Sequence, residues 1–144
     1  MKILTAVFFL MLLSFESFPQ SGFTNVDNLF KNGDFKKTAS EIYGLLSDNK
    51  LTPTQVYDLK FTLDLMERIK KDFTKSRDEV KSYIVKYYPN VTNEQLDAWE
   101  AKKSLEMKII DGEKKYFKLA ARNLFRIDKE AKKRWEEVEG KSPD

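Results

Sequence analysis

Cysteine and histidine are both absent from this sequence of 144 residues. Their absence excludes a disulfide framework, a cysteine nucleophile, a histidine general base, and thiolate or imidazole metal ligands. Aspartate, glutamate, lysine and tyrosine are abundant, but no spacing among them singles out a catalytic pair, and surface ion pairs account for them. We therefore expect a protein that is not an enzyme and that uses neither a cofactor nor a metal.

A hydrophobic run long enough to cross a membrane is also missing. The longest apolar run, Ile3–Phe15, spans 13 residues, whereas a membrane-spanning helix needs about 20. Because Lys2 precedes it, this run is typical of a secretory signal peptide. We expect residues 1–20 to be a signal peptide, and an uncleaved anchor is the alternative. The mature chain is then exported to the periplasm, the cell surface or the medium, with no stable membrane insertion after cleavage.

The rest of the composition is that of a folded protein. Hydrophobic residues make up 41% of the chain and aromatic residues 13%, which is enough for a packed core. The length allows one domain, or a small domain together with a segment of something larger.

Positive charge is concentrated in one region. Residues 101–134 contain 12 basic and 5 acidic side chains, a net charge of +7, whereas the whole chain has a net charge of +3. Such a basic face attracts nucleic acid, anionic envelope polymers or an acidic protein surface. A solvated, lysine-rich helix face is the alternative interpretation.

The first predicted element of the mature chain is a short helical hairpin in residues 21–50. Gly33 and Asp34 supply the turn between its two helices. Helical spacing predicts a buried stripe formed by Phe35, Ala39, Ile42, Tyr43 and Leu46. Val26–Leu46 also resembles the middle of a tetratricopeptide repeat, but no second copy follows, and one repeat cannot bury its face by stacking. We therefore favour a generic helical hairpin.

Three capping boxes predict where helices begin in the domain expected at residues 51–140. They are Thr52-x-x-Gln55, Ser76-x-x-Glu79 and Thr92-x-x-Gln95. The helical pattern after the first box continues to about Phe73. The second helix ends before Pro89, and its predicted inner face consists of Val80, Tyr83, Ile84 and Tyr87. The third helix is short and should bury Leu96 and Trp99.

The pattern of residues 105–117 predicts a β-hairpin. Asp111-Gly112 is a favoured pair for a two-residue type I′ turn, in which both residues adopt a positive φ. This turn places Ile109 opposite Lys114 and Met107 opposite Tyr116. An isolated hairpin is only marginally stable in water, so we expect its apolar side to pack on the preceding helices. The predicted contact consists of Leu105, Met107 and Ile109, packed on Tyr83, Leu96 and Trp99.

A long C-terminal helix is expected after the hairpin. Its apolar stripe is formed by Ala120, Leu124, Ile127, Ala131, Trp135 and Val138. Gly140 is a natural helix stop, and residues 141–144 form a polar tail. The predicted fold class is therefore mainly α, a helical bundle with one β-hairpin.

Two short helices followed by a hairpin resemble a winged helix, whose wing and helix can grip DNA. We expect no nucleic-acid partner, because an exported chain meets no genome and the helix that contains Asp97 and Trp99 is acidic. The geometry can be winged-helix-like without that function.

Most of residues 60–140 resemble a known family. The stretches are MERIKKDF (66–73), VKSYIVKYYPNVTNEQLDAWEAKKSLEMKIIDGEKKYFKLAARNLFRID (80–128) and the following KEAKKRWEEVEG. They are similar to the N-terminal, pre-catalytic region of exported bacterial transglutaminase-like proteins. The chemistry of that family needs a Cys, His and Asp constellation in a later domain. No catalytic residue can be assigned here, because this chain has neither Cys nor His, and the resemblance implies an accessory module.

Two hypotheses about function follow from these patterns. In the first, the chain is a non-catalytic helical module that packs on or assists a transglutaminase-like domain. In the second, it is a free-standing envelope protein that binds an acidic protein or polymer. Both use the basic hairpin-helix face, whose expected partner interface consists of Lys115, Phe117, Arg122 and Arg126.

Overall fold

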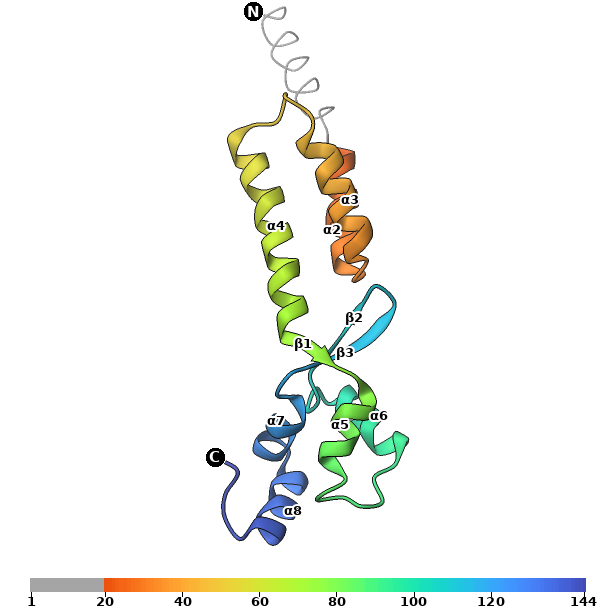
Figure 1. Ribbon diagram of the computed structural model, residues 1–144, viewed down its shortest axis with the longest axis vertical. Helices are drawn as coiled ribbons and strands as arrows, with labels where there is room; N and C mark the ends of the chain where they lie inside the picture. The colour runs from red at the N-terminus through yellow and green to blue at the C-terminus, as the bar shows by residue number, and fades with distance from the viewer. Residues whose placement is uncertain (1–19) are drawn as a thin grey trace, which may run out of the picture. The chain divides into compact units, whose positions relative to one another are not determined.

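The computed structural model describes residues 20–144, so the signal-peptide prediction lies outside the described residues apart from Gln20. The chain is mainly helical with one small antiparallel sheet, which confirms the expected fold class (Figure 1). The described residues divide into two compact units, one that ends at Phe61 and one that begins at Thr62, and each is described separately below. No helix within residues 20–144 is long and apolar enough to cross a membrane.

The first unit contains the predicted helical hairpin. Its helices are α2 (Gln20–Lys31) and α3 (Phe35–Leu46), which lie side by side (Figure 1). Gly33 has a φ of +78° at the turn between them, a left-handed conformation that glycine adopts without a steric penalty. The turn position was therefore predictable from the sequence.

The buried side of α3 differs in part from the predicted stripe. Phe35 and Ile42 are buried as expected, but Tyr43 is 63% exposed, so that part of the prediction is wrong. Thr38 is fully buried instead, and its hydroxyl donates to the carbonyl oxygen of Asp34 at 2.7 Å. This hydrogen bond satisfies the hydroxyl, which removes the main cost of burying a polar side chain.

Helix α4 (Pro53–Asp72) begins at the first predicted capping box. The amide of Gln55 donates to the Thr52 hydroxyl at 3.2 Å, and the amide of Thr52 donates to the Gln55 side-chain oxygen at 2.9 Å. Pro53 occupies the first helical position. A backbone N–H at this position has no hydrogen-bond partner within the helix, so proline, which lacks the N–H, is well suited to it. The division between the two units lies inside this helix, after Phe61, whereas the sequence placed a boundary in the loop before residue 51.

The second unit continues with a short strand and two helices. Strand β1 (Phe73–Lys75) follows α4 directly, and α5 (Arg77–Ile84) and α6 (Asn93–Ala101) come next. Both reciprocal hydrogen bonds of the capping box are present at the start of α5, between Ser76 and Glu79. At the start of α6, the Thr92 side chain accepts from the amide of Gln95 at 3.1 Å. The predicted starts of these helices are confirmed.

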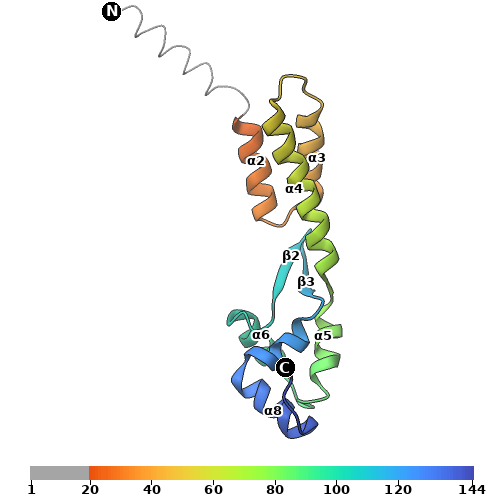
Figure 2. The same cartoon turned by 90° about the vertical axis from the view of Figure 1, so that its left-hand side faces the viewer.

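Strands β2 (Met107–Ile110) and β3 (Glu113–Phe117) form the predicted hairpin (Figure 2). Asp111 has a φ of 50° and Gly112 a φ of 82°, as a type I′ turn requires. Met107 lies opposite Tyr116 and Ile109 lies opposite Lys114, so the predicted register is confirmed.

Strand β1 makes the sheet three-stranded, which the sequence did not predict. The strand order is β1-β3-β2, and β1 pairs with β3 so that Phe73 lies opposite Phe117. The two rings pack with their centroids 5.8 Å apart. Phe117 thus packs on Phe73 and on the core cluster, whereas its place in the expected partner interface implied an exposed ring.

The hairpin packs on the helices through fewer residues than predicted. Leu105 is buried in one apolar cluster with Leu96 and Trp99, and Met107 packs against that cluster. Ile109, by contrast, is 52% exposed, and Tyr83 is 46% exposed, so these two parts of the predicted contact are wrong. On the same strand Ile110 is 8% exposed, so the apolar residue that is buried beside the turn is Ile110 and not Ile109.

The predicted long C-terminal helix is in fact two helices. They are α7 (Ala120–Ile127) and α8 (Lys129–Glu139), and they meet at Asp128, whose backbone is extended with φ −88° and ψ 123°. The Asp128 carboxylate accepts from the amide of Ala131 at 3.0 Å and so caps α8. The break lets α7 and α8 pack on each other, and it leaves Ile127 62% exposed.

Candidate functional site

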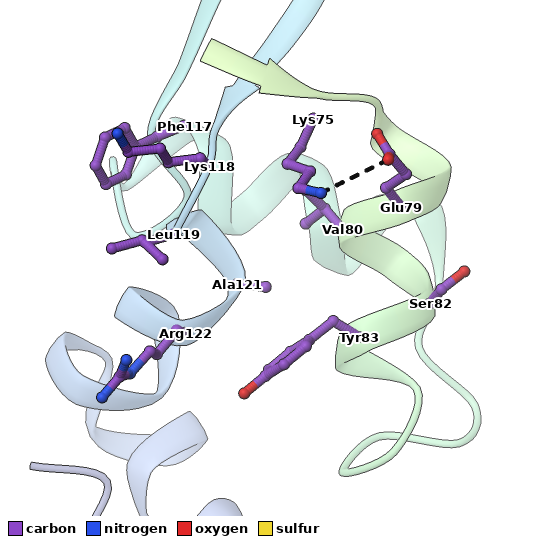
Figure 3. A pocket seen from close by; sticks show the side chains of 10 residues that line it. All are labelled: Lys75, Glu79, Val80, Ser82, Tyr83, Phe117, Lys118, Leu119, Ala121 and Arg122. Carbon is purple, nitrogen blue, oxygen red and sulfur yellow. Dashed lines mark ion pairs between the residues drawn. The ribbon is translucent and has the colours of Figure 1, made fainter. Parts of the chain in front are cut away.

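A pocket lies in the second unit between α5 and the segment that joins β3 to α7 (Figure 3). Its volume is about 460 Å³. Its lining residues are Lys75, Glu79, Val80, Ser82, Tyr83, Phe117, Lys118, Leu119, Ala121 and Arg122. Because α5 packs against both β3 and α7, residues far apart in the sequence meet around one hollow.

Local structure explains how each wall is positioned. The Ser76 capping box starts α5 directly after β1, so that Lys75 and Glu79 lie at one end of the pocket. On the opposite wall, the amide of Lys118 donates to the carbonyl oxygen of Asp72 at 2.8 Å. That bond holds the end of β3 beside the end of α4, within the second unit. Leu119 then precedes α7 and remains 44% exposed at the pocket.

The floor of the pocket is apolar. Val80 is buried, and Phe117 and Ala121 pack against the core cluster. Tyr83 extends from α5 toward α7 (Figure 3), and its ring centroid lies 6.3 Å from that of Phe125. Tyr83 packs against Phe125 and is still 46% exposed. Its ring therefore forms an aromatic surface that a ligand in the pocket can contact.

The charged groups of the pocket are mostly positive. Lys75 lies 3.7 Å from the Glu79 carboxylate (Figure 3). Lys118 lies 2.8 Å from the carboxylate of Asp72. The hydrogen bond from the Ser76 amide lowers the pKa of the Glu79 carboxyl, and the charge of Lys75 lowers this pKa further. Arg122 is exposed and forms no ion pair with any residue in the part of the chain that the structure describes. Its guanidinium is thus available to an added carboxylate.

A second, smaller pocket of about 220 Å³ adjoins the first. Tyr83 and Arg122 line both pockets. The other lining residues of the second pocket are Trp135, Lys141, Ser142, Pro143 and Asp144. The two hollows therefore meet at Tyr83 and Arg122, and we call their combination the α5–α7 groove.

The structure brings together only part of the expected interface. Phe117 and Arg122 both line the larger pocket, although Phe117 belongs to its floor. Lys115 is half-buried and pairs with Glu113 at 3.1 Å, and it lies outside the lining set. Arg126 follows Arg122 by one helical turn and also lies outside that set.

Several lining residues were not singled out by the sequence. Lys75 lies in β1, whose pairing with β3 no local pattern reveals, and Lys118 directly follows β3. Tyr83 was assigned to the inner face of its helix, because it shares the helical spacing of Val80 and Tyr87. A detectable signal was the pair Lys118-Leu119, a cation and a large apolar residue directly before a helix.

A second polar cluster in this unit has a structural role. The Glu100 carboxylate is 9% exposed and accepts from Arg77 at 2.7 Å and from Lys114 at 2.8 Å. The Tyr116 hydroxyl also donates to Glu100, and Arg77 bonds to Asp97 at 2.9 Å. Every member has partners, and the cluster joins α5, α6 and β3. Burial first, and then the hydrogen bond to Glu100, raise the pKa of Tyr116 to about 12.

Neither site contains a group of acidic side chains placed to hold a metal ion. The same holds for all of residues 20–144. In the same part of the chain, no buried side-chain nitrogen or oxygen lacks a hydrogen-bond partner. The α5–α7 groove has features of a binding site, namely an apolar floor, the aromatic ring of Tyr83 and the available guanidinium of Arg122.

Comparison with known proteins adds no relative to this description. No protein-family model matches the chain, and no curated protein or solved structure is significantly similar to it. The resemblance to the pre-catalytic region of transglutaminase-like proteins and the likeness to a winged helix therefore stay predictions from the sequence.

Proposed function

We propose that this chain is a non-catalytic binding module that takes an acidic, partly apolar segment of a partner protein into the α5–α7 groove. The observation on which this proposal depends is the position of Arg122. Its guanidinium has no acidic partner within residues 20–144 and lies where both pockets meet. A carboxylate bound there gains a charge-assisted hydrogen bond, and a guanidinium can make it bidentate.

The surroundings of Arg122 favour a protein segment over a purely charged polymer. The pocket floor is formed by Val80, Phe117 and Ala121, with Tyr83 and Leu119 exposed beside it. Such a surface takes up apolar side chains, and exposed aromatic and aliphatic groups around a positive charge are typical of the centre of a protein interface. The occupant that fits combines glutamate or aspartate with leucine or phenylalanine.

The proposal includes two further expectations from the sequence. Export is supported by Lys2 and the apolar run Ile3–Phe15. The mass of the protein purified from its host tests it, since an intact first methionine in a cytoplasmic fraction contradicts it. A transglutaminase-like domain is the first partner to examine, because residues 60–140 resemble the region that precedes such a domain. An acidic envelope protein is the alternative partner.

The test measures binding of the labelled peptide EELFEE by fluorescence anisotropy. We expect the purified protein to bind this peptide and to bind KKLFKK and QQLFQQ much more weakly. Arg122→Glu replaces the attractive charge with a repulsive one and should weaken binding at least about fivefold. Added salt should weaken binding to the native protein, because part of the groove is open to solvent.

The matched control is Lys129→Glu, which makes the same change of net charge at the start of the neighbouring helix, α8. Lys129 is exposed and lies outside the lining of both pockets, so we expect less than about a twofold effect on affinity. Equal losses in the two variants would mean that general charge attraction, and not the groove, is responsible. Equal binding of EELFEE and KKLFKK would contradict the proposed function.

A further inference from the structure

One wall of the smaller pocket is made by the chain segment Lys141–Asp144. This segment follows Gly140, which ends α8 with a φ of 69°. The left-handed turn at Gly140 lets the chain fold back toward Trp135, and Pro143 becomes buried. The segment thus closes one end of the α5–α7 groove, next to Arg122.

The segment is held at the edge of the groove by its own carboxylate. The Asp144 carboxylate accepts from Lys132 at 2.9 Å and from the Ser142 hydroxyl at 3.0 Å. The hydrogen bond from Lys132 lowers the pKa of Asp144 most, and the charge of Arg126 adds to the effect. A buried apolar ring followed by a carboxylate is also the chemistry that we propose for the partner.

The segment is held loosely enough to be released. Lys141, Ser142 and Asp144 are all exposed, and the Lys132–Asp144 ion pair is open to solvent. Exposed ion pairs contribute little to stability, so one such pair and one buried proline leave the segment only weakly fixed. A ligand that offered more contacts to Tyr83 and Arg122 would displace it.

We infer that Lys141–Asp144 is a built-in competitor for the α5–α7 groove, which an acidic peptide displaces when it binds. This inference rests on the proposed function. It predicts that the free protein exists mainly with the segment in place. Affinity for the peptide is then reduced by the fraction of molecules in which the groove is closed.

Trp135 reports the position of the segment. It lines the smaller pocket and is half-buried, whereas Trp99 is 5% exposed and lies in the core. Quenching of fluorescence by acrylamide therefore responds chiefly to Trp135. Asp144→Asn removes the ion pair with Lys132, and we expect greater quenching. Addition of EELFEE to the native protein should alter quenching as the peptide replaces the segment.

Binding of EELFEE to the same variant completes the test. Asp144→Asn should tighten binding about twofold to fivefold, the change expected from losing an exposed ion pair that competes with the ligand. Glu137→Gln is the matched control, because it removes an acidic partner of Arg134 at 3.4 Å on the same helix and leaves the segment intact. It should change neither quenching nor affinity.

Two results would overturn the inference while the proposed function stands. One is unchanged quenching in Asp144→Asn, which would show that the segment is not held by the ion pair. The other is increased quenching with unchanged affinity, which would show that the segment does not compete. Absence of EELFEE binding to both proteins would instead refute the proposed function, and the inference with it.

Discussion

Among single residues, Tyr116 shows how burial and hydrogen bonding act together. Its side chain is 1% exposed, and its hydroxyl donates to Glu100 and accepts from Arg77 at 3.3 Å. Both burial and the nearby carboxylate oppose loss of the phenolic proton, so the pKa is raised from 10 to about 12. In the unfolded chain this pKa returns to about 10.

The raised pKa makes stability depend on pH in a defined window. A group with a higher pKa in the folded state stabilises the fold fully below its unfolded pKa, here pH 10. That contribution is lost as the pH rises toward the folded value of about 12. Tyr116→Phe should lower the free energy of unfolding by about 1–2 kcal/mol at pH 8 through its lost hydrogen bonds, and by less at pH 11. Urea denaturation of both proteins at the two pH values measures this.

Tyr57→Phe is the control for Tyr116, since it removes the same atom from a ring that is 67% exposed. We expect its stability to match the native protein within about 0.5 kcal/mol at both pH values. If the difference between the native protein and Tyr116→Phe were the same at pH 8 and pH 11, the Tyr116 proton would not be coupled to folding.

Among the elements, the β2–β3 hairpin offers two neighbouring positions with opposite environments. Met107 packs against the core cluster, whereas Ile109 on the same strand is 52% exposed. Met107→Asp places a charge against apolar side chains and should destabilise the fold by about 2–4 kcal/mol. Ile109→Asp should cost about 1 kcal/mol or less. Thermal melts of the two variants check the placement, and equal losses would mean that the hairpin packs differently.

Local patterns predicted most of these elements, because the forces that start and turn them are local. A capping box needs only residues three apart, as with Ser76 and Glu79. The register of the hairpin follows from two residues with positive φ, Asp111 and Gly112. Buried positions on single helices, such as Leu96, follow from helical spacing.

The elements that escaped prediction depend on contacts between distant residues. Strand β1 has three residues and exists because β3 pairs with it. The break at Asp128 divides a continuous helical pattern, and it is favoured because α8 then packs on α7. The α5–α7 groove depends on both features. Its walls come together because β1 pairs with β3 and because α7 ends before Asp128. Two of the four expected interface residues, Phe117 and Arg122, line it nevertheless.

For the molecule as a whole, the two units differ in their cores. The main buried cluster is drawn from residues 80–131 and belongs entirely to the second unit. Among its described residues, the first unit has a smaller core, in which Val26, Phe35, Ile42 and Leu59 are buried. Small units bury a low fraction of their surface and are marginally stable, so the first unit should be the weaker of the two.

The two tryptophans separate the unfolding of these units by experiment. Trp99 and Trp135 both lie in residues 62–144, so tryptophan fluorescence follows the second unit, whereas far-ultraviolet circular dichroism follows helices of both. Ile42→Asp puts a charge at a fully buried position of α3 and should cost more than about 3 kcal/mol. We expect this variant to lose helical signal at low temperature and to keep the midpoint of its fluorescence transition.

Tyr43→Asp provides the control at the adjacent position, because Tyr43 is 63% exposed on the same helix. It should leave both transitions unchanged. The reciprocal variant, Leu124→Asp, removes a fully buried side chain of the second unit and should lower the fluorescence midpoint strongly. If Ile42→Asp lowered the fluorescence midpoint as much as Leu124→Asp does, the chain would unfold as one cooperative body. Separate transitions would instead show that the second unit, with the groove, keeps its fold when the first is lost.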